Sequence, residues 1–147
     1  MRSPRVELER ALAACAAAPS GDHVVLERAA RRVLSFCKRA QRPARALLDI
    51  ALAEERDIME DRVAGRSAPY PRRVATADTA RALAYAVREC TDRSVVLLEY
   101  RADRGWLQPE AHFRTTCSLL RAFASPLHSK ARDWILSRMV LGGQREL

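Results

Sequence analysis

Three histidines and four cysteines are the side chains of this chain best suited to nucleophilic or metal chemistry. A catalytic Cys–His dyad carried by one helix needs both residues on the same face, three or four positions apart. The nearest such pair, His112 and Cys117, is five residues apart, and neither His23 nor His128 stands in a recognisable partner motif. The sequence therefore predicts no catalytic residues and a protein that is not an enzyme.

Metal and cofactor sites find equally little support. The cysteines form no C-x-x-C pair, which is the spacing used by zinc ribbons and thioredoxin-like proteins. The acidic run from Glu54 to Asp61 lacks the histidine with which helix-borne carboxylates bind metals, and no glycine-rich phosphate loop is present. We predict no metal and no cofactor. We also expect reduced thiols on or near apolar helix faces, where a free cysteine behaves as a small hydrophobic group, at Cys15, Cys37, Cys90 and Cys117.

Helices must position all of these side chains, because apolar residues recur at helical spacing along almost the whole chain. Proline, glycine and capping residues divide the pattern into seven segments. We therefore predict an all-α fold, a compact single-domain helical bundle over residues 1–147. Its seven expected helices cover about 4–18, 22–40, 43–61, 76–92, 94–100, 109–124 and 125–141.

Two parts of this pattern are less regular. Residues 94–100 hold two valines and a tyrosine, which also suit a buried strand. The chain has no second β-rich run with which such a strand could pair, so a helix is favoured there. Residues 64–75 contain a glycine and two prolines, which interrupt helices, and they are predicted to form an exposed loop.

The stretch 106–141 carries two clear apolar stripes and is predicted to be a helical hairpin. Ser125 is expected to cap its second helix, and Gly142-Gly143 is expected to end it. Trp106 is predicted to anchor the start of the hairpin. The core residues expected from it are Phe113, Leu120, Trp134 and Ile135.

The chain is basic, with a net charge of +8 and a pI near 10.2. This charge favours an anionic partner such as nucleic acid or a lipid headgroup, but 24 of the 26 basic residues are arginine, a bias that a GC-rich genome also produces. Aromatic residues make up 5% of the chain and are expected in the core, which leaves no stacking platform for single strands. Nucleic-acid binding is therefore the alternative function, through the basic residues Arg28, Arg31, Arg32, Lys38, Arg39, Arg42 and Arg45.

No apolar run reaches the roughly 18 residues needed to cross a bilayer, and the first residues lack the apolar region of a secretory signal. We expect a soluble, cytoplasmic protein with no membrane span.

Four segments of the second half resemble a known family. They are D-T-A-R-A-L-A-Y-A-V from Asp78, R-G-W at Arg104, A-H-F-R-T-T-C-S-L-L-R-A-F from Ala111 and W-I-L-S-R-M from Trp134. In this order they resemble the last four helices of the poxvirus Bcl-2-like proteins. The Arg- and Ala-rich composition is similar to that of a GC-rich poxvirus.

The resemblance implies a non-enzymatic protein-binding module that intercepts a host protein in the host-cell cytoplasm. Its target would be a helical segment of an apoptosis protein held in a groove, or a component of innate immune signalling. The signalling inhibitor is favoured, because G-G-Q-R-E-L follows the last predicted helix in place of a membrane anchor. The oligomeric state is left open, a homodimer included. The groove would be walled by Leu47, Leu48, Ala51, Leu52, Ile58, Met59, Leu83 and Val87.

Overall fold

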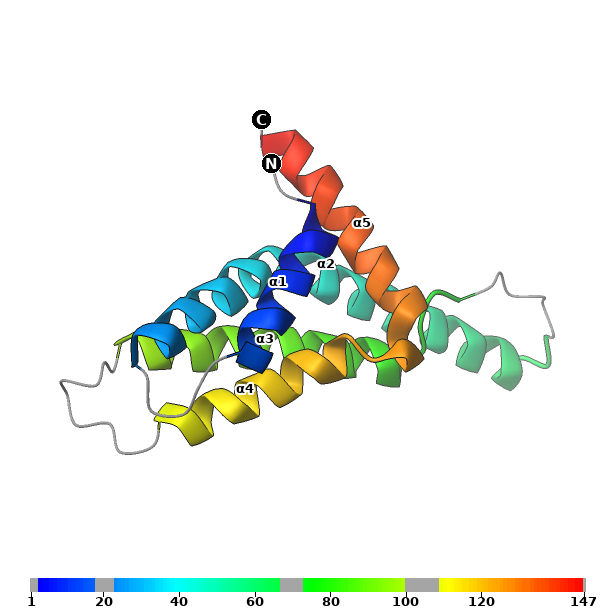
Figure 1. The fold of residues 1–147 in the computed structure, drawn as a ribbon. Coiled ribbons are helices and arrows are strands. Elements are labelled where there is room, and N and C mark those ends of the chain that lie inside the picture. Colours follow the sequence, from blue (N-terminus) through cyan, green and yellow to red (C-terminus); the bar gives the residue numbers. More distant parts are fainter. Residues whose placement is uncertain (1–2, 18–22, 67–72, 100–108, 147) are drawn as a thin grey trace.

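The computed structural model describes residues 3–17, 23–66, 73–99 and 109–146, and every regular element in these ranges is a helix. The all-α prediction is confirmed, whereas the number of helices is wrong, because five α-helices replace the expected seven (Figure 1). They are α1 (Pro4–Ala17), α2 (His23–Val63), α3 (Ala77–Glu99), α4 (Pro109–Phe123) and α5 (Ser129–Glu146), with a short 3-10 helix η2 (Pro126–His128) before α5.

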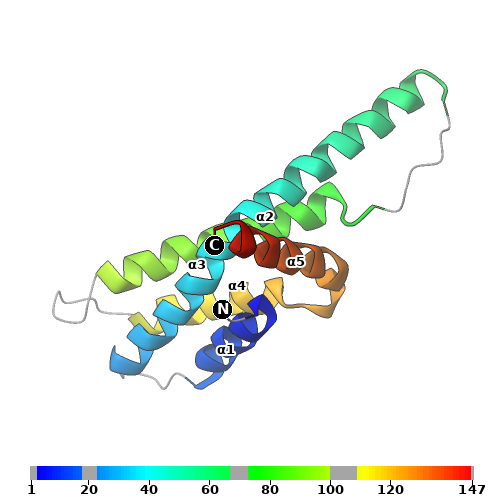
Figure 2. The same ribbon diagram turned by 90° about the horizontal axis from the view of Figure 1, so that it is seen from above.

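The expected helices 22–40 and 43–61 are one continuous helix, α2, with Pro43 inside it. Proline has no N–H to bond the carbonyl four residues earlier and its ring crowds that carbonyl, so it usually bends a helix. Figures 1 and 2 both show α2 bent near the middle of its length. The helix continues because its buried stripe runs on past the proline without a break in spacing, through Ala40, Ala44, Leu47 and Ala51.

The expected helices 76–92 and 94–100 likewise form one helix, α3. No glycine or proline lies between Ala77 and Glu99, and the buried positions Cys90, Ser94 and Leu97 keep helical spacing. The helical reading of 94–99 is thus confirmed, and residue 100 lies outside the described ranges. Thr76 is the N-cap, since its Oγ1 accepts from the backbone N–H of Thr79 at 3.2 Å.

Both helices of the predicted hairpin are present, but the hairpin packing is wrong, because α4 packs mainly on α3 and α5 mainly on α2. Ser125 does act as a cap, accepting from the N–H of Leu127 at 3.3 Å, but it caps η2 rather than the α-helix. The Gly142-Gly143 stop is wrong, because α5 continues to Glu146. Glycine inside a helix costs only about 1 kcal/mol relative to alanine, which does not by itself end a helix.

One buried cluster draws on all five helices. Phe36 of α2 and Phe123 of α4 meet edge to face within it, with ring centroids 5.8 Å apart. The predicted core residues Phe113, Leu120 and Ile135 are buried, which confirms them, whereas Trp134 is only half-buried against the cluster. The Arg138 guanidinium lies 5.0 Å from the Trp134 ring centroid and covers its outer face. Trp106 lies outside the described residues.

The helices pack as an antiparallel layer with two crossing members. α3 runs antiparallel to α2 on one side and to α4 on the other, while α1 and α5 pack on α2 and complete the core (Figures 1 and 2). None of the helices in the described ranges combines the length and the apolar character that crossing a membrane requires.

The last turns of α2 extend beyond the other helices in both views. They end in an ordered cap, in which Arg66 N–H donates to the Asp61 carbonyl at 2.8 Å and Gly65 N–H to the Arg62 carbonyl at 3.2 Å. Gly65 has φ +71°, the left-handed conformation that this type of cap requires. The loop predicted at 64–75 is non-helical where it is described, and residues 67–72 lie outside those ranges.

Candidate binding groove between α2 and α3

The structure brings the predicted groove residues together mostly as core. Five of the eight are buried between the helices: Leu47, Leu48, Ala51, Leu83 and Val87. Such residues belong to the buried cluster, and only Leu48, which is 8% exposed, keeps some surface that a partner could contact. Of the other three, Ile58 is half-buried, and Leu52 and Met59 are exposed.

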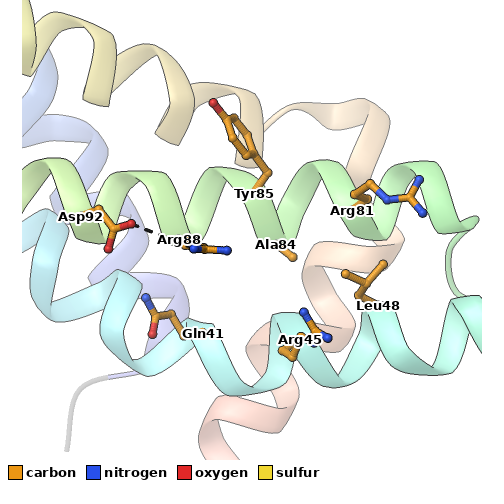
Figure 3. A pocket seen from close by; sticks show the side chains of 8 residues that line it. All are labelled: Gln41, Arg45, Leu48, Arg81, Ala84, Tyr85, Arg88 and Asp92. Carbon is orange, nitrogen blue, oxygen red and sulfur yellow. Dashed lines mark ion pairs between the residues drawn. The ribbon is translucent and has the colours of Figure 1, made fainter.

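A pocket of about 510 Å³ does lie between α2 and α3, directly outside this core. The residues that line it are Gln41, Arg45, Leu48, Arg81, Ala84, Tyr85, Arg88 and Asp92. Figure 3 shows the α2 side chains lying between the two helices, opposite Ala84 and Arg88. Leu48 is therefore the one residue of the predicted groove that also lines the pocket.

The pocket combines an apolar floor with a positive rim. Leu48 and Ala84 supply the floor, and the rim carries the guanidinium groups of Arg45, Arg81 and Arg88. Each arginine also has a carboxylate from its own helix nearby. These ion pairs are Arg45–Asp49 at 3.3 Å, Arg81–Asp78 at 3.3 Å and Arg88–Asp92 at 4.0 Å. Because all three pairs are exposed, each contributes little stability, and an incoming carboxylate can replace the local one.

Tyr85 forms the outer edge of the pocket. It rises from α3 on the side away from α2 (Figure 3), and 57% of its surface is exposed. An exposed tyrosine presents a large, rigid apolar ring with one polar end, which is why tyrosine is enriched at protein-binding surfaces.

A row of apolar side chains leads from the pocket to the projecting end of α2. Leu48, Leu52, Met59 and Val63 follow one another at intervals of four, seven and four residues, which places them along one line of the helix. Their exposed fractions rise from 8% to 38%, 61% and 84% along that line. The row therefore starts in the pocket floor and ends on a helical surface that faces solvent.

The residues of the predicted basic surface all lie on α2. The seven residues fall on one side of the helix at 100° per residue, and six of them are exposed while Arg39 is half-buried. Three of the seven are held in ion pairs: Arg31 with Glu27 at 2.9 Å, Arg39 with Glu7 at 2.7 Å, and Arg45 with Asp49. Arg45 alone belongs to both the basic surface and the pocket. This surface comprises Arg28, Arg31, Arg32, Lys38, Arg39, Arg42 and Arg45.

The cysteines, widely separated in sequence, meet in two pairs inside the bundle. All four are free thiols, three of them buried and Cys15 half-buried. A hydrogen bond from Cys117 lowers the pKa of Cys15, against the effect of partial burial, and the Arg121 guanidinium lowers it further. In the other pair, the bond between Cys37 and Cys90 and then burial raise the pKa of Cys37. Sequence spacing contains no signal for these pairs, since each joins two helices.

The structure places His112 and Cys117 in different surroundings on α4. Partial burial, then the charge of Arg93, lowers the pKa of His112, whereas Cys117 contacts Cys15 of α1. Within the described part of the chain, no group of three or more His, Cys, Asp or Glu side chains could hold a metal ion. The pocket between α2 and α3 is much larger than the pocket of about 60 Å³ that Glu7, Arg10, Arg32 and Ser35 line.

Comparisons of the chain with protein-family models, with curated proteins and with solved structures find no match. The function must therefore be inferred from the groove itself.

Proposed function

We propose that the protein is a protein-binding module whose α2–α3 groove takes a helical segment with an apolar face and acidic flanks. The observation that carries this proposal is the combination, in one pocket, of an apolar floor with three arginines on its rim. Helix-binding grooves work in this way, with apolar anchors at helical spacing set between two helices and charges at the border that fix orientation.

The charge of the rim determines the chemistry of the partner. Arg45, Arg81 and Arg88 come from two different helices and face one groove, so a segment lying along it meets positive charge on both sides. Carboxylates bind guanidinium groups with two parallel hydrogen bonds, which favours glutamate and aspartate at the flanks of the partner. Leu48 and Ala84 then receive its apolar side chains.

The resemblance to poxvirus Bcl-2-like proteins stays a prediction, as does a host apoptosis or immune-signalling protein as the target. That resemblance was based on a layout of seven helices, and five are described. The present proposal uses only the groove and does not depend on a viral origin.

Nucleic-acid binding remains the second candidate, because the seven basic residues share one side of α2. Such a surface would bind phosphates without sequence preference, and its affinity would fall steeply with salt as counterions are released.

Fluorescence anisotropy with two labelled probes tests these candidates. One probe is an amphipathic peptide with leucine on one face and glutamate on both flanks, and the other is a single-stranded oligonucleotide. We expect the peptide to bind and Arg45→Glu to weaken it by about ten-fold or more. Arg28→Glu is the matched control, since it makes the same charge change at an exposed position of α2 outside the pocket.

An equal loss of peptide affinity in both variants would show general charge attraction and refute the groove. Tight binding of the oligonucleotide alone, with equal sensitivity to both substitutions and a steep salt dependence, would support the basic surface instead.

A further inference from the structure

The two halves of α2 carry opposite charge. From Arg28 to Arg45 there are seven basic residues and no acidic one, whereas residues 46–63 hold six acidic residues and two basic ones. The positive half contributes Arg45 to the groove, and the negative half contains the exposed apolar row. One helix thus carries both a positive groove wall and an acidic, apolar-faced segment of the kind that we propose the groove takes.

The C-terminal end of the acidic half projects away from the other helices. The backbone N–H of Ala77, the first residue of α3, donates to Glu55 Oε1 at 3.0 Å, so α3 begins beside Glu55. The two turns that follow in α2 extend beyond the bundle (Figures 1 and 2). They are a formed helix with an ordered cap, in which the Arg66–Asp61 ion pair of 2.9 Å accompanies the turn at Gly65. Their apolar residues Met59 and Val63 face solvent.

We infer that the occupant of the groove is the projecting end of α2 from a second copy of this chain, so that the protein forms a two-fold symmetric dimer. This inference rests on the proposed function, because it names the partner of the same groove. A two-fold interface is self-complementary, which means that each copy gives its α2 end and receives the other.

The spacing along α2 fits an antiparallel pairing of the two copies centred on Leu52. Arg45 and Met59 are each seven residues from Leu52, or about 10 Å along the helix axis. With Leu52 against Leu52 of the second copy, Met59 of one copy therefore lies beside Arg45 of the other. The exposed apolar row then covers the pocket floor at Leu48, while the neighbouring Glu60 comes within reach of the positive rim.

Charge complementarity favours this occupant over an unrelated apolar helix. In the antiparallel arrangement centred on Leu52, residues 41–45 of each α2 lie along residues 59–63 of the other, so Arg42 and Arg45 of one copy come within reach of Glu60 of the other. Burial of Leu52, Met59 and Val63 adds an apolar contribution proportional to the area removed from water.

Sedimentation velocity and light scattering over a wide range of protein concentrations test the inference. We expect the purified full chain to be a dimer that dissociates on dilution. Met59→Glu and Arg45→Glu should each raise the dissociation constant by at least about ten-fold. Arg45→Glu combined with Glu60→Arg should restore the dimer, since the exchanged charges attract each other again. Leu127→Glu, at an apolar position that is 90% exposed on η2, is the control that should not change it.

A chain that stays monomeric at all concentrations, or a dimer unchanged by Met59→Glu, would overturn the inference. Circular dichroism of each variant separates loss of the dimer from loss of the fold. If the protein is a monomer that binds the acidic peptide, and Arg45→Glu abolishes this binding, the dimer would be refuted and the proposed function would stand. A monomer that binds no peptide would refute both. Release of monomer from the dimer by the acidic peptide would support both.

Discussion

Replacing Phe36 with alanine should destabilise the protein more than any surface substitution. Phe36 and Phe123 are both completely enclosed, and their edge-to-face contact joins α2 to α4 at the centre of the buried cluster. Truncation of a buried phenylalanine to alanine costs about 3–5 kcal/mol, because the transfer free energy is lost and a cavity remains.

The aromatic contact can be separated from the general loss of volume. Phe36→Leu keeps most of the apolar volume and removes the ring, and the same holds for Phe123→Leu. If the edge-to-face geometry contributes by itself, the double variant should be less destabilised than the sum of the two single ones. The expected coupling energy is about 0.5–1.5 kcal/mol, the range found for aromatic pairs beyond their buried area.

Urea unfolding followed by circular dichroism measures the loss of stability and the coupling energy, and thermal unfolding followed in the same way gives Tm. For a domain of this size, 1 kcal/mol corresponds to a shift of roughly 2–4 °C in Tm, so Phe36→Ala should lower Tm by about 6–20 °C. Leu127→Ala is the control, since Leu127 is almost fully exposed and should change Tm little. A Phe36→Ala protein with unchanged stability would refute the packing of α2 against α4. Coupling near zero would refute only the energetic role of the ring contact.

Three further outcomes can be measured on single variants. Gly65→Ala should lower the free energy of unfolding in urea by about 1–2 kcal/mol, because alanine is strained at φ +71°; no loss would mean that the α2 cap is arranged differently. Iodoacetamide should alkylate Cys15 before the other thiols and at a pH below that typical of a free thiol, because its pKa is lowered. Arg121→Ala should shift the pH dependence of the Cys15 alkylation rate to higher pH, because the thiolate loses a positive neighbour. Glu7→Gln should cost about 1–3 kcal/mol through its 2.7 Å ion pair with Arg39, which joins α1 to α2, and an unchanged urea midpoint would contradict this role.

The fold class could be predicted because helical periodicity is a strong local signal. The predicted helix boundaries were wrong where local sequence signals compete with packing. Pro43 is a sound reason to end a helix in an isolated segment. In this protein the apolar stripe keeps its register past the proline, and burial of Ala44, Leu47 and Ala51 in the core outweighs one missing hydrogen bond. The predicted helix end at Gly142-Gly143 was wrong for a related reason, since glycine lowers the stability of a helix without ending it.

The sequence groups residues of α2 and α3 as possible groove walls, but it does not show how deeply each residue lies in the bundle. Periodicity indicates which residues share a helix face, so it grouped Leu47 with Leu52, but it cannot show which of them a neighbouring helix covers. That depends on where α3 lies, and the structure buries Leu47 while leaving Leu52 exposed. The arginines of the rim were missed because Arg81 and Arg88 seemed to be ordinary solvent-facing residues of one helix. Only the pairing of α2 with α3 brings them beside Arg45.

The helix α2 bends near the middle of its length. A straight helix of 41 residues would be about 60 Å long. Pro43 lies close to the point where the charge changes sign, two residues before Arg45, the last basic residue of the positive half. The positive half packs with α1, where Glu7 binds Arg39. The acidic half stays in the bundle as far as Ala51 and Glu55, and its last two turns project. The proline therefore lies inside the part of α2 that builds the bundle, and only the turns after Glu55 are available to a partner.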